Sequence, residues 1–287
     1  MKLIRFGEKG KELPGIQTSE GKYLDCSGFG EDWNEAFFDS NGLDRLSDWL
    51  KSNQDKLKEI LTGARLGSPI ARPSKIICIG LNYRKHAEEA GMAVPEVPII
   101  FMKATSSLCG PFDPILIPKN SVKTDWEVEL AVVIGKKAKY VKKENAYDYI
   151  AGYCLHNDVS ERDFQLHHGG QWVKGKSADH FAPLGPVLVT RDEIKDPHNL
   201  RLWLKLNGKT LQHSSTSDLI FDIPTLIAHL SQYMTLLPGD VISTGTPAGV
   251  GMGLKPEPQY LKEGDVVELG IEGLGISKQV AINDPEA

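Results

Sequence analysis

The chain has 287 residues, of which 40% are hydrophobic and 25% are charged. These proportions are typical of globular proteins and exclude wholesale disorder, and the length fits one large domain or two smaller ones. The 33 basic and 38 acidic side chains leave a formal charge of −5, which argues against a nucleic acid or an anionic membrane surface as the main partner.

The four cysteines are far apart in the sequence and form no C-x-x-C pair, which excludes a zinc knuckle or a thioredoxin-type motif. Cys78 and Cys154 lie in apolar runs and are expected to pack as small hydrophobic side chains. The first residues lack the apolar run of a signal peptide, and no apolar run approaches the ~20 residues that cross a bilayer. We therefore expect a cytoplasmic protein that does not enter membranes.

The amino-terminal part predicts a small α/β unit. Leucines at steps of three and four residues predict a helix over residues 43–61, which Gly63 ends. A proline-containing linker follows at residues 64–74. We place a domain boundary there, which divides the chain into a small N-terminal domain, residues 1–70, and a main domain, residues 71–287. Short strands are expected in the small domain at residues 2–6, 15–17 and 23–25.

Strand patterns dominate the rest of the chain. Helices are expected only near residues 83–90, after Asp158 and after Asp222. Because strands and helices do not alternate regularly, the pattern argues against a Rossmann sheet and a (β/α)8 barrel. Strands are expected at residues 75–79, 99–102, 115–117, 128–134, 150–155, 187–190, 202–206, 240–243, 266–271 and 276–282.

Two glutamates stand out at the start of one predicted strand. Glu127 and Glu129 are two residues apart, so their side chains share a face. Ala131 and Val133 continue that face, which indicates that it turns towards the core, although a solvated acidic face is the alternative for such a pair alone. Two carboxylates about 5 Å apart repel by about 3 kcal/mol at an effective dielectric near 20, and burial adds to this. A divalent cation such as magnesium, manganese or calcium removes the conflict.

Asp158 is the best candidate for a third oxygen ligand, because it follows the apolar strand at residues 150–155. The alternative is a helix N-cap, since Asp158-x-x-Glu161 also has the spacing of a capping box.

A histidine and a glutamate share one face of the predicted helix near residues 83–90. His86 and Glu89 are three residues apart, and a carboxylate beside an imidazole fixes its tautomer and raises its basicity, as a general base requires. The alternative is an ordinary charged surface helix.

Two glycine-rich segments require interpretation. Residues 170–177 match the P-loop pattern G-x-x-x-x-G-K-S/T, but no buried strand precedes them and no long helix can follow, so we interpret the match as accidental and expect no nucleotide there. Lys176 nevertheless places a cation in this loop. A strand at residues 240–243 leads into a second glycine-rich loop, whose N–H groups and hydroxyls either hold a carboxylate or belong to an ordinary turn.

In this order the segments resemble the fumarylacetoacetate hydrolase family, over roughly residues 73–282. The matching motifs are Gly80-x-Asn82-Tyr83-x-x-His86-x-x-Glu89, Glu127-x-Glu129, Asp158-x-x-x-Arg162-Asp163-x-Gln165, Lys176-Ser177 and Thr244-Gly245-Thr246-Pro247-x-Gly249-Val250-Gly251.

The resemblance implies an α+β, β-rich fold, a mixed β-sheet rolled around the site, with a small N-terminal α/β domain, and a homodimer. It places a magnesium or manganese ion on Glu127, Glu129 and Asp158. His86 and Glu89 become a catalytic dyad on a mobile, lid-like segment.

The same resemblance makes Lys176 a catalytic residue that helps to bind and polarise the substrate. Arg162, Gln165 and Thr246 are the implied substrate-binding residues. The implied partner is a small-molecule 2-oxo acid, with no nucleic acid and no membrane involved.

The implied activity is metal-dependent hydrolysis of a C–C bond in a 2,4-dioxo acid, either an acylpyruvate or a diketo-deoxy sugar acid. An oxaloacetate decarboxylase, a tautomerase or a ureidoglycolate-type lyase on the same metal site is the alternative. Residues 175–186 are similar to the branch that contains hydrolases of 2,4-diketo-3-deoxy sugar acids and relatives labelled ureidoglycolate lyase.

Overall fold

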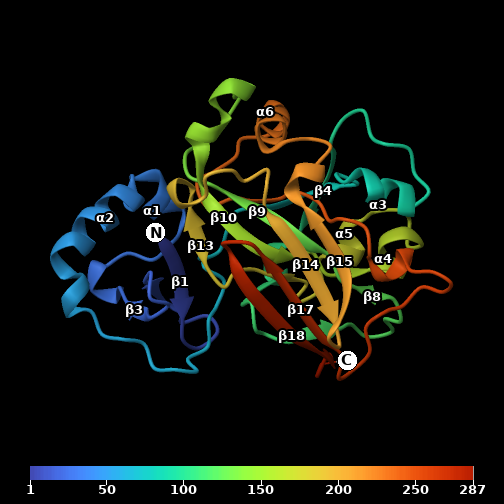
Figure 1. Cartoon of the computed structure of the whole chain (residues 1–287), viewed down its shortest axis with the longest axis horizontal. Coiled ribbons are helices and arrows are strands. Elements are labelled where there is room, and N and C mark those ends of the chain that lie inside the picture. Colours follow the sequence, from blue (N-terminus) through green and yellow to red (C-terminus); the bar gives the residue numbers. More distant parts are fainter. Residues whose placement is uncertain (287) are drawn as a thin grey trace.

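The computed structural model describes residues 1–286. Two sheets form its centre, and Figure 1 shows the N-terminal residues at one end of the molecule and helices α3, α4 and α5 at the other. The nine-stranded mixed sheet contains, in spatial order, β3 (Tyr23–Asp25), β2 (Leu13–Gln17), β1 (Lys2–Phe6), β13 (Leu188–Thr190), β10 (Ile150–Asn157), β9 (Val128–Ile134), β16 (Val241–Ser243), β4 (Ile76–Gly80) and β5 (Ile99–Lys103). The five-stranded sheet contains β15 (Lys209–Ser215), β14 (Arg201–Leu206), β17 (Val266–Ile271), β18 (Gly275–Asn283) and β7 (Ile115–Ile117).

Shorter elements connect the two sheets. The α-helices are α1 (Glu35–Asp39), α2 (Gly42–Asn53), α3 (Arg84–Glu89), α4 (Arg162–Leu166), α5 (Val173–Lys176) and α6 (Ile223–Tyr233). Two-stranded pairs form between β8 (Thr124–Asp125) and β11 (Ser160–Glu161), and between β6 (Leu108–Cys109) and β12 (Ala182–Pro183). Single-turn and longer 3-10 helices occupy η1 (Ser27–Phe29), η2 (Gln54–Lys56), η3 (Thr105–Ser107), η4 (Lys143–Tyr149), η5 (Arg191–Glu193), η6 (Thr216–Asp218) and η7 (Gly251–Gly253). The predicted β-rich α+β class is confirmed.

Strands β9 and β10 form the buried centre, and both are buried along their whole length. One face of β9 carries Leu130 and Val132, which share a hydrophobic cluster with residues of β14 and β17 in the second sheet. The other face carries Ala131 and Val133, which pack with Trp33 and other residues of the N-terminal part. Glu129 lies on this second face, so the face of the predicted carboxylates does turn into the interior and away from the five-stranded sheet.

Within the first 70 residues, strands β1, β2 and β3 belong to the main sheet. Strand β1 pairs with β13, with Lys2 opposite Val189 and Leu3 opposite Leu188. The division of the chain after residue 70 stays a prediction, because strand pairing describes packing and not independent folding. Within residues 1–286, no helix combines the length and the apolar character that crossing a bilayer requires.

The predicted helix over residues 43–61 is wrong after residue 53. Helix α2 ends at Asn53, and the chain is extended from Leu57 onwards, where the amide of Ile60 donates to the carbonyl of Tyr23 at 2.9 Å. Leu57 packs against one hydrophobic cluster and Ile60 against the other. Side chains three residues apart point to opposite sides in a strand, and Leu57 and Ile60 do so. The spacing of the leucines alone did not reveal this.

The pairing of β10 with β13 makes a prediction about stability. A Cβ atom on Gly152 would lie 2.2 Å from the carbonyl oxygen of Val189 in the paired strand. We expect Gly152→Ala to lower the free energy of unfolding by about 1–3 kcal/mol, the usual effect of overpacking a core. Denaturant titration measures this, with exposed Gly28→Ala as the control, whose Cβ would meet only Trp49 at 3.8 Å. Equal stability of the two variants would contradict the close approach of the strands.

Candidate metal centre and catalytic site

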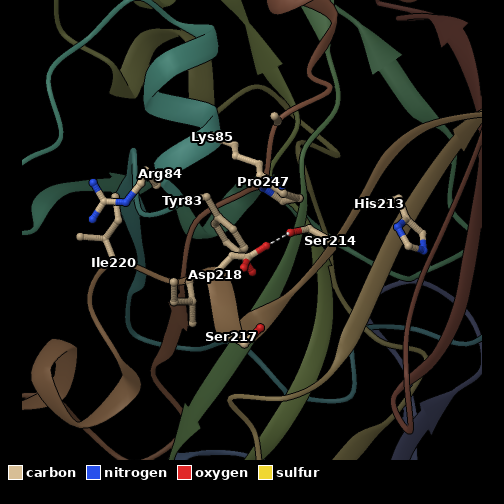
Figure 2. A pocket seen from close by; sticks show the side chains of 11 residues that line it. Tyr83, Arg84, Lys85, His213, Ser214, Ser217, Asp218, Ile220 and Pro247 are labelled. Atoms are coloured by element: carbon tan, nitrogen blue, oxygen red, sulfur yellow. Dashed lines mark hydrogen bonds between the residues drawn. The ribbon is translucent and has the colours of Figure 1, made fainter.

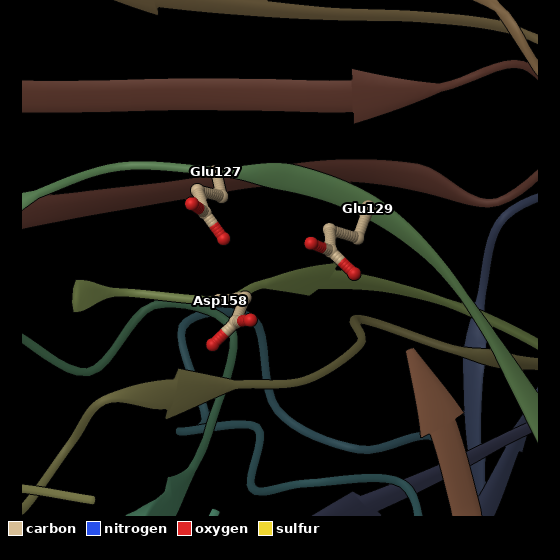
Figure 3. A group of neighbouring side chains, drawn as sticks. All are labelled: Glu127, Glu129 and Asp158. Atoms are coloured by element: carbon tan, nitrogen blue, oxygen red, sulfur yellow. The ribbon is translucent and has the colours of Figure 1, made fainter. Parts of the chain in front are cut away.

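Three carboxylates converge where β9 begins and β10 ends. Glu127 precedes β9, Glu129 lies within it, and Asp158 follows β10, with its amide donating to the carbonyl of Glu127 at 2.9 Å. One oxygen of each side chain lies within 4.8 Å of the others, and Figure 3 shows the three carboxylates facing a common centre. Their exposures are 5%, 2% and 0% in that order. The solvated-face alternative for the two glutamates is therefore wrong.

Asp158 is a cluster member and not a helix cap. The N-cap of α4 is Glu161, whose side chain accepts a hydrogen bond from the amide of Asp163. The side chain of Asp158 instead accepts hydrogen bonds from the ammonium groups of two buried lysines, Lys103 and Lys176. Burial alone opposes ionisation of Asp158, but these two cations more than offset it and hold its pKa below its ordinary value.

Lys176 joins two of the carboxylates. Its Nζ lies 2.7 Å from Glu127 Oε2 and 2.9 Å from Asp158 Oδ2. Burial lowers the pKa of this amine, yet Asp158 and Glu127 raise it by more, so the side chain is an ammonium. The preceding residues do not form a P-loop, because α5 follows helix α4 and the intervening turn, with no strand before it.

Glu129 is held differently from its two neighbours. Its Oε2 accepts hydrogen bonds from Ser243 Oγ at 2.6 Å and from the Gly245 amide at 2.8 Å, and it forms no ion pair with any residue in the described range 1–286. Burial raises its pKa well above the ordinary value, and Asp158 and Glu127 add to the effect. A buried carboxylate that faces two others and lacks a cation of its own fits a hard divalent ion, which prefers oxygen ligands.

His86 and Glu89 form the predicted pair on α3. His86 Nδ1 lies 3.2 Å from Glu89 Oε2, and the other oxygen of Glu89 accepts from the Gly249 amide at 2.9 Å. Because a carboxylate accepts, Nδ1 carries the proton and Nε2 is left as the basic nitrogen. Arg84, Lys85 and Glu88 are exposed whereas His86 is buried, so the surface-helix alternative describes only the outer side of α3.

A cavity of about 280 Å³ is lined by His86, Glu127, Glu129 and Lys176. The predicted substrate-binding residues Arg162, Gln165 and Thr246 line it as well. Arg162 is engaged within the protein, because Nε donates to Asp125 at 2.8 Å, Nη2 lies 2.8 Å from Glu127 Oε1, and Nη1 donates to Gln165 Oε1 at 3.1 Å. Its guanidinium thus positions Glu127 and Gln165. Thr246 donates to the carbonyl of Val128 at 3.0 Å.

The glycine-rich loop after β16 holds carboxylates that belong to the protein itself. Four of its amide groups donate to acidic side chains: Gly245 to Glu129, Gly249 to Glu89, and Gly251 and Met252 to Asp125. The loop does hold carboxylates, as one of the two interpretations expected, but they are side chains of the protein itself.

The sequence did not predict three residues of the site, Lys103, His156 and Ser243. Lys103, at the end of β5, is fully buried and also donates to the Val159 carbonyl at 2.9 Å; burial lowers its pKa. His156 Nδ1 lies 2.6 Å from Ser243 Oγ, and burial lowers the pKa of His156 to about 3, so this imidazole is neutral. The available signal for Lys103 was a lysine at the end of an apolar strand. The available signal for His156 was its position two residues before Asp158 on the same strand face.

A larger cavity of about 540 Å³ lies at the base of α3 (Figure 2). Exposed Arg84 and Lys85 line it, and Ser214 donates to Asp218 there at 2.8 Å. None of the proposed metal ligands lines it. Among residues 1–286 the carboxylate triad is the single group of three or more side chains arranged to hold a metal ion, so the smaller cavity is the candidate active site.

Comparisons with known proteins agree with this geometry. Residues 75–281 match the family model described as fumarylacetoacetate (FAA) hydrolase C-terminal. A protein of Burkholderia multivorans, provisionally named a hydrolase, is 52% identical over 281 residues, which are 98% of each chain.

Solved structures share the fold over nearly the whole chain. The fumarylacetoacetate hydrolase of the psychrophile Exiguobacterium antarcticum is 35% identical, with a TM-score of 0.85 and 99% of each chain covered. The maleylpyruvate hydrolase of Sphingobium sp. SYK-6, in complex with manganese(II) and pyruvate, is 29% identical, with a TM-score of 0.82 over 99% of this chain and 100% of that one. The chain described here therefore belongs to the fumarylacetoacetate hydrolase family.

Proposed function

We propose that the protein is a divalent-metal-dependent hydrolase that cleaves a C–C bond in a 2,4-dioxo acid, an acylpyruvate or a diketo-deoxy sugar acid. One observation carries the proposal: two glutamates of the buried carboxylate triad, the His86 imidazole that is paired with Glu89, and the buried Lys176 ammonium line a single cavity. The manganese and pyruvate reported for the maleylpyruvate hydrolase relative support it.

Glu127, Glu129 and Asp158 would hold the ion, magnesium or manganese, which supplies a Lewis acid for the adjacent oxygens of a 2-oxo acid. The triad fits this role because its carboxylates converge and because Glu129 has no ion-pair partner in residues 1–286.

His86 would act as the general base towards water. Its Nε2 takes a proton from a water molecule whose oxygen attacks the carbonyl carbon at position 4 of the substrate. Glu89 selects the tautomer, since it accepts the hydrogen bond of Nδ1 and so makes Nε2 the nitrogen that accepts a proton, and it stabilises the imidazolium that forms.

Bond cleavage then separates carbons 3 and 4. The electron pair of the broken bond passes into the enolate of pyruvate, and the acyl part leaves as a carboxylic acid. The Lys176 ammonium lies beside the cavity and stabilises the developing negative charge. The imidazolium of His86 returns the proton to carbon 3, which balances the reaction as substrate plus water giving pyruvate and an acid.

The remaining parts of the proposal rest on the family resemblance. They are a homodimer, a cytoplasmic location and membership of the branch that contains the sugar acid hydrolases. Lys176 as a catalytic residue and Arg162, Gln165 and Thr246 as substrate-binding residues belong to the proposal as well.

The metal site can be tested without measuring activity. We expect manganese at 100 times its dissociation constant to stabilise the protein by about 2.7 kcal/mol, the value for one site that forms only in the folded state. Glu129→Gln removes a ligand charge but keeps the shape, so this stabilisation should be lost, whereas Glu268→Gln on β17 should retain it. Thermal unfolding with and without manganese is the measurement. Undiminished metal stabilisation of Glu129→Gln would refute the assignment.

The dyad separates hydrolysis from decarboxylation. We expect His86→Ala to lower the rate of hydrolysis of a 2,4-dioxo acid by about 10²–10⁴-fold, the usual contribution of a general base. Glu89→Gln should cost less, because it leaves the imidazole in place. Decarboxylation of oxaloacetate needs no attacking water and should fall less in His86→Ala.

Steady-state rates with both substrates, at fixed metal concentration, provide the comparison. Manganese titration of His86→Ala is the control, because metal affinity should be unchanged. An equal decrease of both reactions would make His86 a binding residue and not the base for water.

A further inference from the structure

The candidate active-site cavity is polar at one end and apolar at the other. Glu127 and Glu129 of the triad, His86 and Lys176 border one part of it. The rest of the wall comes mainly from apolar side chains, among them Leu81, Met92, Phe101, Leu166, Trp172 and Met252.

Contacts from Lys176 to Phe101 and from Phe101 to Trp172 run along one wall of the cavity. The Nζ of buried Lys176 lies 4.9 Å from the centre of the Phe101 ring. The Phe101 ring in turn meets the Trp172 ring edge-on at 5.2 Å between centres. Trp172 is half-buried and Met92 is 50% exposed, so the aromatic wall leads from the charged end towards solvent.

The position of Trp172 is built into the fold. A Cβ atom on Gly80, at the end of β4, would lie 2.7 Å from the indole ring, so glycine at this position leaves room for it. Gly169 and Gly170 have φ values of +87° and +67°, which reverse the chain just before the indole. The P-loop-like segment thus brings Trp172 and Lys176 to the same cavity.

Two uncharged polar side chains other than the indole of Trp172 line the wall, Gln165 and Thr246, and their oxygens are engaged within the protein. Gln165 Oε1 accepts from Arg162, and Thr246 Oγ1 donates to Val128 and accepts from Gln212 Nε2 at 2.8 Å. Hydroxyls that lie against the faces of the Phe101 and Trp172 rings would lose water without finding a hydrogen-bond partner on those faces, which is unfavourable in a buried site.

We infer that the substrate is a 2,4-dioxo acid whose acyl end is apolar, an alkyl or aryl group, and that Trp172 with Phe101 selects it over a sugar acid. This inference rests on the proposed function, because that function places the pyruvyl end at the charged part of the cavity. The cavity volume of about 280 Å³ suits a small ligand such as a pyruvyl unit with a short acyl group.

A matched pair of substrates tests the inference. 2,4-Dioxohexanoate and 5,6-dihydroxy-2,4-dioxohexanoate have the same carbon chain and differ only in two hydroxyls. We expect the manganese-loaded enzyme to prefer the first in kcat/KM by roughly 10²-fold, the scale on which an apolar pocket rejects an added hydroxyl. Trp172→Ser should reduce this ratio at least tenfold, mainly through KM of the apolar substrate, and Trp172→Phe should retain most of it.

Trp203→Ser is the matched control, because this indole lies on β14 outside the cavity and its loss should leave the ratio unchanged. Preference for the dihydroxy substrate would overturn the inference and leave the hydrolase proposal standing. An unchanged ratio in folded Trp172→Ser would overturn the role of Trp172. Cleavage of neither substrate would contradict the proposed function itself, and the inference with it.

Discussion

The candidate site of this protein depends on a cluster of four buried carboxylates and three buried cations. Asp125, Glu127, Glu129 and Asp158 face the ammonium groups of Lys103 and Lys176 and the guanidinium of Arg162. Each cation comes from a different segment, the end of β5, the start of α4 and the end of α5. Removing one partner of such a buried pair typically costs about 3–5 kcal/mol, because the other charge stays buried. These three segments are therefore fixed relative to β9 and β10 by the same charges that shape the site.

One of the four carboxylates, Glu129, has no cation as an ion-pair partner among the residues described. Glu129 has only neutral partners, the Ser243 hydroxyl and the Gly245 amide, among the residues described. Neutral donors orient a carboxylate without cancelling its charge, so burial and the neighbouring Asp158 and Glu127 raise the pKa of Glu129. A divalent cation would supply the positive charge that this carboxylate lacks. Ser243 has one hydroxyl hydrogen and gives it to Glu129, so the neutral His156 imidazole donates to Ser243 from Nδ1. The Glu129 carboxylate is thus oriented by two uncharged side chains, because His156 donates to Ser243 and Ser243 donates to Glu129.

Short sequence spacings predicted the parts of the site that a single element determines. The two-residue period of a strand placed Glu127 and Glu129 on one face, and the helical three-residue step placed His86 beside Glu89. Spacing could not decide between a ligand and a helix cap for Asp158, because that depends on Lys103, 55 residues away in the sequence. Ser243 was equally invisible, since its contact with Glu129 spans 114 residues. The extended segment at Leu57–Leu61 was mistaken for helix for the same reason, because strand β3, which it pairs with, is remote from it.

One loop joins the proposed base to the proposed metal ligands. Gly245 and Gly249 belong to the same turn after β16, and their amides donate to Glu129 and Glu89. Gly249 has a φ of +104°, and a Cβ atom there would lie 2.0 Å from the carbonyl oxygen of Leu211, so the turn admits no other residue without rearrangement. A displacement of this turn would move the carboxylate that orients His86 together with the carboxylate that faces the triad. The carboxylate that accepts from His86 and the carboxylate of Glu129 are thus both held by amides of one short backbone segment.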